Sequence, residues 1–482
     1  MSRYGQLADQ LQQQITSGLW QPGERIPSIR QSCKTHGLSP MTVLQAYQLL
    51  ESRGLILARP QSGYYVKAAS TARRESQPQQ ARYSGSVDIN DLVFEVLQAS
   101  KSRELAPLGM AVADPTLFPH PQLGRALGSC MRRLDPFSTV ADLPPGNEAL
   151  RRAIARRYAG EGMAVDPQQI IITTGAMEAL SLSLQVLTEP GDWVVVESPT
   201  FYGALQAIER LKLKVVEIPV IPGVGIDLAL LEEALAQRPV KACWLMGNVQ
   251  HPLGHTMPDE HKQALMGLLN RHQVPLVEDD VYAELYVGRE RPRPITHWDA
   301  RGESLLCGSW TKCLAPGFRV GWVVAKRHAE RIQRLQLMST LSTNVPSQLA
   351  LADMLRQGGV DAHFRRLRHT LAQRQQQMRA ALMRLFPEAR ISSPDGGYFL
   401  WLEFDARLDG RALYASAIEQ GVSIAPGALF SSQGQHNHCL RLNSSHPWSP
   451  QLDAALNRLA DLIARQRETW QSPPDASHDK GP

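Results

Sequence analysis

Two basic side chains, Lys312 and Arg319, have types and a spacing that could support chemistry. The apolar run Ser304–Gly308 predicts a buried strand that ends just before Lys312. A lysine in such a place is costly unless it is paired or neutral, and an amine with a depressed pKa can form a Schiff base. Arg319 precedes a second apolar run, 320–325, and is placed to hold a dianionic group. The pair suits pyridoxal phosphate, with the lysine on the aldehyde and the arginine on the phosphate. A surface lysine beside a structural arginine gives the same short pattern, so the surrounding elements must decide.

Those elements are seven strand-like apolar runs that alternate with helical stretches. They are residues 170–173, 194–197, 215–219, 243–246, 276–278, 305–308 and 322–325. This alternation predicts an α/β domain with a mostly parallel seven-stranded sheet and helices on both faces. Ligands of such sheets bind at the carboxyl ends of the strands.

Side chains that could hold a cofactor follow several of these strands. Gly175 and Ala176 open a helix whose free N–H groups suit a phosphate. Phe201 offers a flat ring, and Asp279 and Tyr282 offer a carboxylate and a phenol. A carboxylate keeps a pyridine nitrogen protonated, so that the ring can act as an electron sink. Each feature alone is more typical of a helix cap, a core ring or a solvated acid, but together they are what pyridoxal phosphate requires.

The first 68 residues have a different pattern. Leu7, Leu11 and Ile15 form one stripe of a helix, and Ser28 is placed to cap a second helix. Ser39 can cap a third helix, which has Pro40 at its first position and runs to about residue 53. Two β-rich runs, 55–58 and 64–67, predict a hairpin. Three helices and a hairpin predict a winged helix-turn-helix domain.

Composition limits the class of protein. Residues 1–74 contain nine Lys or Arg and three Asp or Glu, which gives a net charge of +6. The whole chain carries +5, so the remaining residues carry −1. A basic N-terminal end favours a nucleic-acid contact there, although a solvated basic face is the alternative. Six cysteines without regular spacing argue against a disulfide framework or a metal site. Without a membrane-length apolar stretch or a signal peptide, we expect a cytoplasmic protein.

Composition also suggests the domain boundaries. Residues 69–86 are rich in Ser, Gln, Ala and Arg, and we expect a flexible linker there. The large domain then covers residues 87–468, and the polar, Pro-rich residues 469–482 are expected to be a disordered tail.

Residues from about 105 to 465 resemble a fold-type I aminotransferase of class I/II. The resemblance implies that Lys312 binds pyridoxal phosphate as a Schiff base, that Asp279 pairs with its pyridinium nitrogen and that Tyr282 bonds its phenolic oxygen. It also implies that Phe201 stacks on the ring, and that Arg441, within Leu440–Asn443, binds the carboxylate of an effector. The phosphate would be held by Gly175, Ala176, Ser309 and Arg319.

Two departures from the family pattern stand out. His251 replaces the usual asparagine that donates to the phenolic oxygen; a histidine can also donate, but ordinarily titrates near neutrality. The tyrosine often found shortly before Gly146, which reaches the neighbouring subunit's phosphate, is absent, since Ala141 and Asp142 stand there.

Residues 19–66 resemble the GntR-type DNA-binding domain in the segments PGERIPSIR, LSPMTV, AYQLLESRGLI and ARPQSGYYV. The resemblance implies a set of residues that contact double-stranded DNA, from the helices and from the hairpin wing. They are Arg30, Ser39, Thr42, Gln45, Arg59, Ser62 and Gly63.

A GntR-type head on an aminotransferase-like body is similar to the MocR subfamily of bacterial transcriptional regulators. This implies a homodimer, with domain swapping suggested, that binds an operator and senses an amino acid or amine through an aldimine at Lys312. Two alternatives remain open. One is a pyridoxal phosphate-dependent aminotransferase that retains turnover, and the other is a DNA-binding protein whose body only dimerises.

Overall fold

The computed structural model describes residues 3–16, 19–20, 23–53, 55–59, 63–66, 80–85, 89–138 and 142–471. They form two compact units, divided between residues 79 and 80. Within the described residues no helix is long and apolar enough to cross a membrane, and no group of side chains could hold a metal ion.

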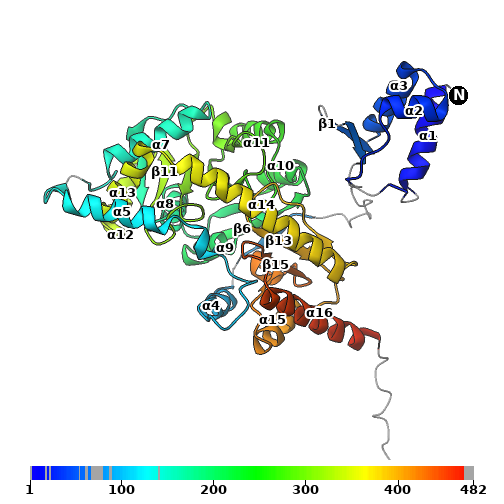
Figure 1. Cartoon of the computed structure of the whole chain (residues 1–482). Coiled ribbons are helices and arrows are strands. Elements are labelled where there is room, and N and C mark those ends of the chain that lie inside the picture. Colours follow the sequence, from blue (N-terminus) through cyan, green and yellow to red (C-terminus); the bar gives the residue numbers. More distant parts are fainter. Residues whose placement is uncertain are drawn as a thin grey trace, which may run out of the picture. The chain divides into compact units, whose positions relative to one another are not determined.

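The N-terminal unit contains helices α1 (Arg3–Thr16), α2 (Ile29–His36) and α3 (Pro40–Ser52), followed by strands β1 (Ile56–Arg59) and β2 (Gly63–Val66) (Figure 1). The two strands pair antiparallel, which confirms the predicted hairpin. Ser28 and Ser39 cap α2 and α3 as predicted, each accepting from a backbone N–H three residues on. The inner face of α3 packs into a core of its own, which includes the fully buried Tyr47. The winged helix-turn-helix prediction is confirmed.

The large unit is built on a nine-stranded sheet with the order β3-β6-β5-β8-β9-β10-β11-β4, with β7 paired to β6. All seven predicted strands are present. They are β4 (Ile170–Thr173), β5 (Trp193–Ser198), β6 (Lys214–Ile221), β8 (Val240–Leu245), β9 (Leu276–Asp279), β10 (Leu305–Ser309) and β11 (Gly321–Ala325). Strands β6, β5, β8, β9 and β10 run parallel, whereas β11 is antiparallel to both of its neighbours. The mostly parallel α/β sheet is therefore confirmed, with two short strands added.

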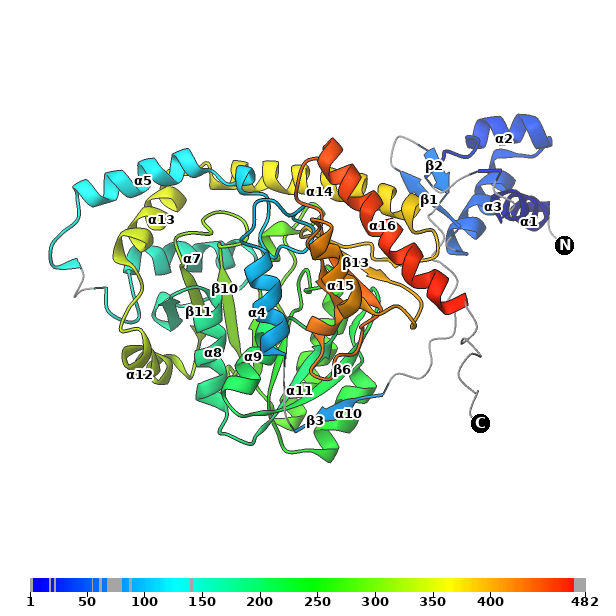
Figure 2. The same cartoon turned by 90° about the horizontal axis from the view of Figure 1, so that it is seen from below.

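Helices cover both faces of this sheet because alternate strand residues point to opposite sides. Val194 and Val196 of β5 pack in the cluster that includes α8 (Ala176–Leu187), α9 (Tyr202–Arg210) and α4 (Asn90–Ala99). Val195, between them, packs with α10 (Leu228–Gln237) and α11 (Asp259–His272). Four further helices lie around the end of the sheet that contains β11 and β4 (Figure 2). They are α5 (His120–Arg132), α7 (Glu148–Gly160), α12 (Ala329–Ser339) and α13 (Val345–Gln357).

A smaller sheet completes the unit, with the strand order β12 (Arg390–Ile391), β13 (Phe399–Glu403), β15 (Cys439–Asn443) and β14 (Ala425–Pro426). The long helix α14 (Val360–Leu385) packs against this sheet and against α16 (Pro450–Gln471), which in turn contacts α15 (Gly410–Glu419) (Figures 1 and 2). Strand β15 carries Arg441.

Two predicted boundaries differ from the structure. Arg82–Ser84, inside the predicted linker 69–86, form strand β3, which pairs antiparallel with the edge strand β6. A three-residue strand without an apolar run leaves no periodic signal, yet it satisfies the open backbone edge of β6. Residues 469–471, assigned to the tail, continue α16, and residues 472–482 lie outside the described residues. The second short strand, β7 (Gly225–Ile226), also pairs with β6.

Candidate functional site

The predicted cofactor residues meet at one edge of the large sheet. Asp279 is the last residue of β9 and Ser309 the last of β10, two neighbouring parallel strands. Phe201 follows β5, and Gly175 follows β4. Because the carboxyl ends of parallel strands lie at the same edge of a sheet, these residues form a single cluster. Arg441 reaches the cluster from the smaller sheet.

Lys312 lies in the turn after β10 and is partly buried. Its Nζ donates to the carbonyl oxygen of Ala111 at 2.9 Å and lies 5.6 Å from the centre of the Tyr282 ring. Burial, and then the positive charge of Arg441, lower the pKa of Lys312 to about 8. A larger share of this amine is therefore neutral near pH 7 than for an ordinary lysine, and the neutral amine is the nucleophile.

Asp279 is almost fully buried at the end of β9, and its Oδ1 has no hydrogen-bond partner among the described residues. Burial raises the pKa of this carboxyl to about 7. An unpaired carboxylate oxygen in the interior is destabilising unless a ligand satisfies it. A protonated pyridine nitrogen would supply the hydrogen bond that Oδ1 of Asp279 lacks and a positive charge to balance the carboxylate.

His251 has one engaged and one open nitrogen. Its Nε2 lies 3.1 Å from Nη1 of Arg441, whereas its Nδ1 is buried without a partner among the described residues. The ring is surrounded by aromatic rings, with Phe201 at 5.4 Å between centres and Tyr282 stacked at 5.9 Å. His251, Phe201 and Tyr282 are thus brought together, as expected for groups around one planar ligand.

Arg441 is almost fully buried and forms no ion pair among the described residues. Its guanidinium lies 4.3 Å from the centre of the Phe399 ring, donates to the carbonyl of Gly109, and leaves Nε without a partner. Burial lowers the pKa of Arg441, but a guanidinium stays protonated. The result is a buried positive charge near Lys312 that no acid in the described part of the chain neutralises.

The predicted phosphate side of the site is built from backbone and small side chains. Gly175 has φ +85°, and a Cβ there would lie 2.8 Å from Nη2 of Arg319, so only glycine lets the arginine approach. Ala176 begins α8 and thereby presents free N–H groups. Arg319 itself has φ +53°, and Ser309 Oγ donates to the carbonyl of Val320 at 2.9 Å and bonds Thr311 Oγ1 at 2.7 Å. Ser309 therefore contacts the Arg319 turn directly.

Several residues at the site were not assigned from sequence. Tyr398 donates from its hydroxyl to the carbonyl of Ala111 at 3.2 Å, and Asn443 Nδ2 donates to the carbonyls of Met110 and Val112. These bonds fix the segment 109–112 over Lys312. For Asn443 a signal was available, since it lies in the segment Leu440–Asn443, which carries the family resemblance. Of the two residues near Gly146, Ala141 lies outside the described residues, and Asp142 accepts from Asn147 Nδ2 at 3.1 Å.

The residues present fit pyridoxal phosphate. The open Oδ1 of Asp279, the open Nδ1 of His251 and the close approach of Arg319 to Gly175 would suit the ring nitrogen, the phenolic oxygen and the phosphate. The amine of Lys312 lies among them.

The predicted DNA-contacting residues lie on the N-terminal unit. Arg30 on α2 and Gln45 on α3 are exposed, and Thr42 is half-buried. Ser39 is exposed, but its hydroxyl caps α3 and bonds Thr42 Oγ1 at 2.9 Å, so part of its role is structural. On the wing, Gly63 begins β2 with φ +107° and Arg59 ends β1. The Arg59 side chain and Ser62 lie outside the described part of the chain.

Comparisons with known proteins match both units. The family described as bacterial regulatory proteins, gntR family, matches residues 3–66, and aminotransferase class I and II matches residues 134–459. The chain is 51% identical over 464 residues to the uncharacterized HTH-type transcriptional regulator YdcR of Escherichia coli (strain K12), covering 96% of this chain and 99% of that protein. It is 37% identical to the uncharacterized HTH-type transcriptional regulator YjiR of the same strain, covering 97% and 100%.

Among solved structures, the multiple substrate aminotransferase from Thermococcus profundus is similar to 78% of this chain and 95% of its own, with a TM-score of 0.72 and 27% identity. The kynurenine aminotransferase of Pyrococcus horikoshii gives the same TM-score with 28% identity, over 78% of this chain and 94% of that one.

Proposed function

We propose that this chain, a DNA-binding transcriptional regulator with a pyridoxal phosphate-type body, senses an amino acid or related amine at Lys312. The chain belongs to the GntR family of bacterial regulatory proteins and carries a class I and II aminotransferase domain, as in the MocR subfamily. The observation that carries the proposal is the buried guanidinium of Arg441, which has no acidic partner in the described part of the chain.

A buried charge without a counter-charge costs several kcal/mol, so a protein keeps one where a ligand supplies the missing charge. The α-carboxylate of an amino acid would supply it here. Within the described residues, Arg441 donates to two neutral acceptors, the ring of His251 and the carbonyl of Gly109, which a carboxylate can displace. Because Lys312 lies close enough for Arg441 to lower its pKa, one ligand could contact both through its carboxylate and its amine.

When bound, pyridoxal phosphate supplies an aldehyde that links to an amine and a ring that absorbs near the visible edge. The residues of this chain would hold it as follows. Asp279 would accept from the ring nitrogen, while His251 Nδ1 and the Tyr282 hydroxyl would donate to the phenolic oxygen. Phe201 would pack on the ring, and Arg319, Ser309 and the start of α8 with its residues Gly175 and Ala176 would hold the phosphate.

A contact route leads from this pocket to the strand where the linker joins the large unit. Arg441 lies 5.8 Å from the centre of the Phe430 ring, and the residues that follow Phe430 bond Glu217 of β6 through Ser431 and Ser432. Gln433 Nε2 donates to the carbonyl of Tyr83 in β3 at 3.2 Å. A ligand that binds better to one arrangement of this loop would shift β3, and with it the tether of the head. Two heads in a homodimer would then read two operator half-sites.

The alternative function is an aminotransferase that retains turnover. The grouping of Lys312, Asp279, Tyr282 and Arg441 at one site favours it, and the similar solved structures are named as aminotransferases. Steady-state transamination with common amino acid and keto acid pairs separates the two functions, because turnover at metabolic rates would contradict a pure sensor.

The proposed sensing is tested by measuring operator-DNA affinity of the pyridoxal phosphate-loaded protein while a panel of amino acids and amines is titrated. We expect one class of amines to change both the cofactor absorbance and the DNA affinity. Arg441→Gln should lose the response to carboxylate-bearing ligands but keep the cofactor band. Gln433→Ala should keep the absorbance change and lose the change in DNA affinity. A DNA affinity that no amine alters would contradict the proposal.

A further inference from the structure

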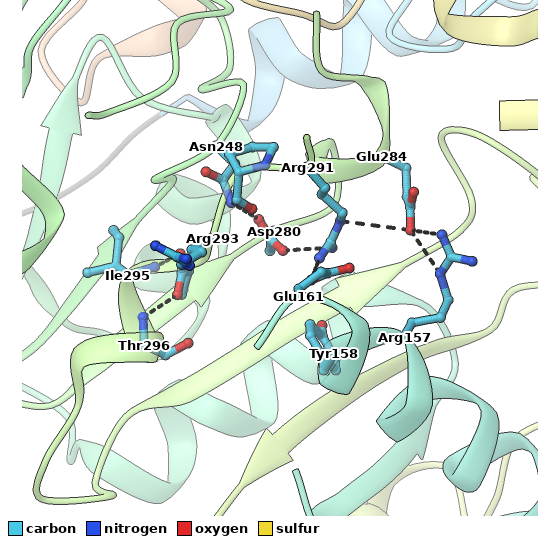
Figure 3. A network of polar contacts seen from close by, with 12 residues as sticks. Arg157, Tyr158, Glu161, Asn248, Asp280, Glu284, Arg291, Arg293, Ile295 and Thr296 are labelled. Atoms are coloured by element: carbon cyan, nitrogen blue, oxygen red, sulfur yellow. Dashed lines mark hydrogen bonds and ion pairs between the residues drawn. The ribbon is translucent and has the colours of Figure 1, made fainter. Parts of the chain in front are cut away.

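A buried network of charged side chains lies behind the cofactor residues. Asp279 ends β9 and Asp280 follows it directly, but the two side chains have different surroundings. Asp279 faces the candidate cofactor site, whereas Asp280 is almost fully buried in this network (Figure 3). The orientation of the Asp279 carboxyl therefore depends, through a single peptide bond, on the side chains that hold the Asp280 carboxyl.

Arg291 forms an ion pair with Asp280. Its Nη2 lies 3.2 Å from Asp280 Oδ2, its Nη1 pairs with Glu161 at the end of α7, and its Nε lies 3.8 Å from Glu284 (Figure 3). Only 12% of the Arg291 side chain is exposed, so these pairs are screened little by solvent. The guanidinium fork suits a site with several acids, because its donors have fixed directions.

Two of the three acids that pair with Arg291 flank Tyr282 in sequence. Asp280 and Glu284 stand on either side of Tyr282, in the turn that runs from β9 into the short helix η3 (Ala283–Leu285). Arg291 and Arg157, which bonds Glu284 at 2.8 Å, thus fasten both ends of the turn that carries Tyr282. Asp279 is the residue immediately before this turn.

The network also reaches the loop that carries His251. Asn248 Nδ2 donates to Asp280 Oδ1 at 2.8 Å, and Asn248 Oδ1 accepts from Nζ of Lys262 at 2.7 Å. Lys262 is fully buried on α11 and also donates to the carbonyl of Arg293 at 2.7 Å. Asp280 therefore links β9 to the 248–251 loop as well as to Arg291.

We propose that Arg291 is a positioning residue for the cofactor site, which acts through Asp280 to fix Asp279, Tyr282 and His251 relative to one another. The inference rests on the proposed cofactor role of these three residues. Among the described residues, Arg291 contacts no side chain that is predicted to touch the cofactor, so its effect is one of alignment. A site built on a rigidly held set of side chains binds its ligand more tightly than a loose one.

The simpler reading is that the network only stabilises the fold. The two readings differ in what a variant changes, since a structural role alters the unfolding midpoint but not the orientation of a bound cofactor. Visible circular dichroism of the cofactor band reports that orientation, and a titration of the apoprotein with pyridoxal phosphate reports affinity.

The test compares Arg291→Gln, Asp280→Asn and the double variant in the full chain. We expect each single variant to weaken pyridoxal phosphate binding by about tenfold and to change the visible dichroism. The loss in the double variant should be smaller than the two single losses combined, because both single variants break the Arg291–Asp280 pair. Arg291→Lys, which keeps the charge but not the fork, should recover part of the affinity.

Arg379→Gln is the matched control, because Arg379 is half-buried on α14 and donates to the carbonyl of Ser392 at 3.1 Å, away from the turn. It should lower the unfolding midpoint and leave the dichroism and the affinity unchanged. An Arg291→Gln protein with a lower midpoint but wild-type affinity and dichroism would overturn the proposal. Failure of the wild-type chain to take up cofactor would instead refute the cofactor assignment.

Discussion

The guanidinium of Arg441 donates from Nη1 to Nε2 of His251 at 3.1 Å. An arginine has no acceptor, so Nε2 must accept, and the single proton of a neutral imidazole then sits on Nδ1. Burial, followed by the charges of Arg441 and Lys312, holds the pKa of His251 well below its ordinary value. Unlike an ordinary histidine, His251 therefore does not titrate near neutrality, and it is a neutral donor throughout the physiological pH range.

We predict that His251→Asn keeps cofactor affinity within about threefold, because an amide can also donate to the phenolic oxygen. His251→Leu should weaken binding by about five- to tenfold, the value of one lost hydrogen bond. Titration of the apoproteins with pyridoxal phosphate measures both. Equal losses in the two variants would show that the ring of His251 matters for packing and not for donation.

The buried carboxyl of Asp279 should destabilise the protein without cofactor. Its pKa is about 7 in the folded protein and about 3.9 when unfolded. The folded state then binds more protons between these values, so stability falls as pH rises from about 4 to 7 and stays lowered above. At pH 8, Asp279→Asn should therefore unfold at a higher urea concentration than wild type. Its free energy of unfolding should exceed that of wild type by at most ~4 kcal/mol. The advantage should shrink toward pH 4, and a pH-independent difference would contradict the argument.

Gly175→Ala should specifically weaken phosphate binding. The added Cβ would lie 2.8 Å from Nη2 of Arg319, so the guanidinium must move. Gly162→Ala is the control, because Gly162 also has positive φ, at +77°, but its Cβ would meet nothing within 4 Å. Both variants should lose stability because of the positive φ, on the order of 1 kcal/mol for Gly162→Ala and more for Gly175→Ala. Only Gly175→Ala should raise the Kd for pyridoxal phosphate, and equal Kd values would contradict the assigned cradle.

Arg30→Ala should weaken operator binding and lower the slope of log affinity against log salt by about one, as expected for a lost phosphate contact. Cofactor uptake should be unchanged. Arg53→Ala is the control from the same unit, since Arg53 is paired with Asp9 at 2.6 Å. A salt slope that Arg30→Ala leaves unchanged would remove this residue from the DNA-contacting set.

Strong local signals explain what could be predicted from sequence. The seven apolar runs became strands, and the Ser28 and Ser39 caps began helices, because burial and capping are decided within a few residues. Strand β3 was placed in a linker because its pairing with β6 joins residues more than a hundred positions apart.

Contacts between distant segments also hid part of the site. The bond from Lys312 to Ala111, and the grouping of Glu161, Asp280 and Arg291, bring together residues that no spacing rule connects. The family resemblance supplied the roles of first-contact residues such as Asp279 and Lys312. It was silent on the side chains behind them, whose partners depend on the folded arrangement of several loops.

The most direct test of the account is the rate at which the apoprotein captures pyridoxal phosphate covalently, measured by its absorbance as a function of pH. With a Lys312 pKa of about 8, the neutral amine should increase about fivefold from pH 7 to 8, and the rate should level off by about pH 9. Lys312→Ala should show no covalent band. A rate that rises about tenfold per pH unit through pH 9, as for an ordinary lysine of pKa about 10.4, or a band that persists in Lys312→Ala, would contradict it.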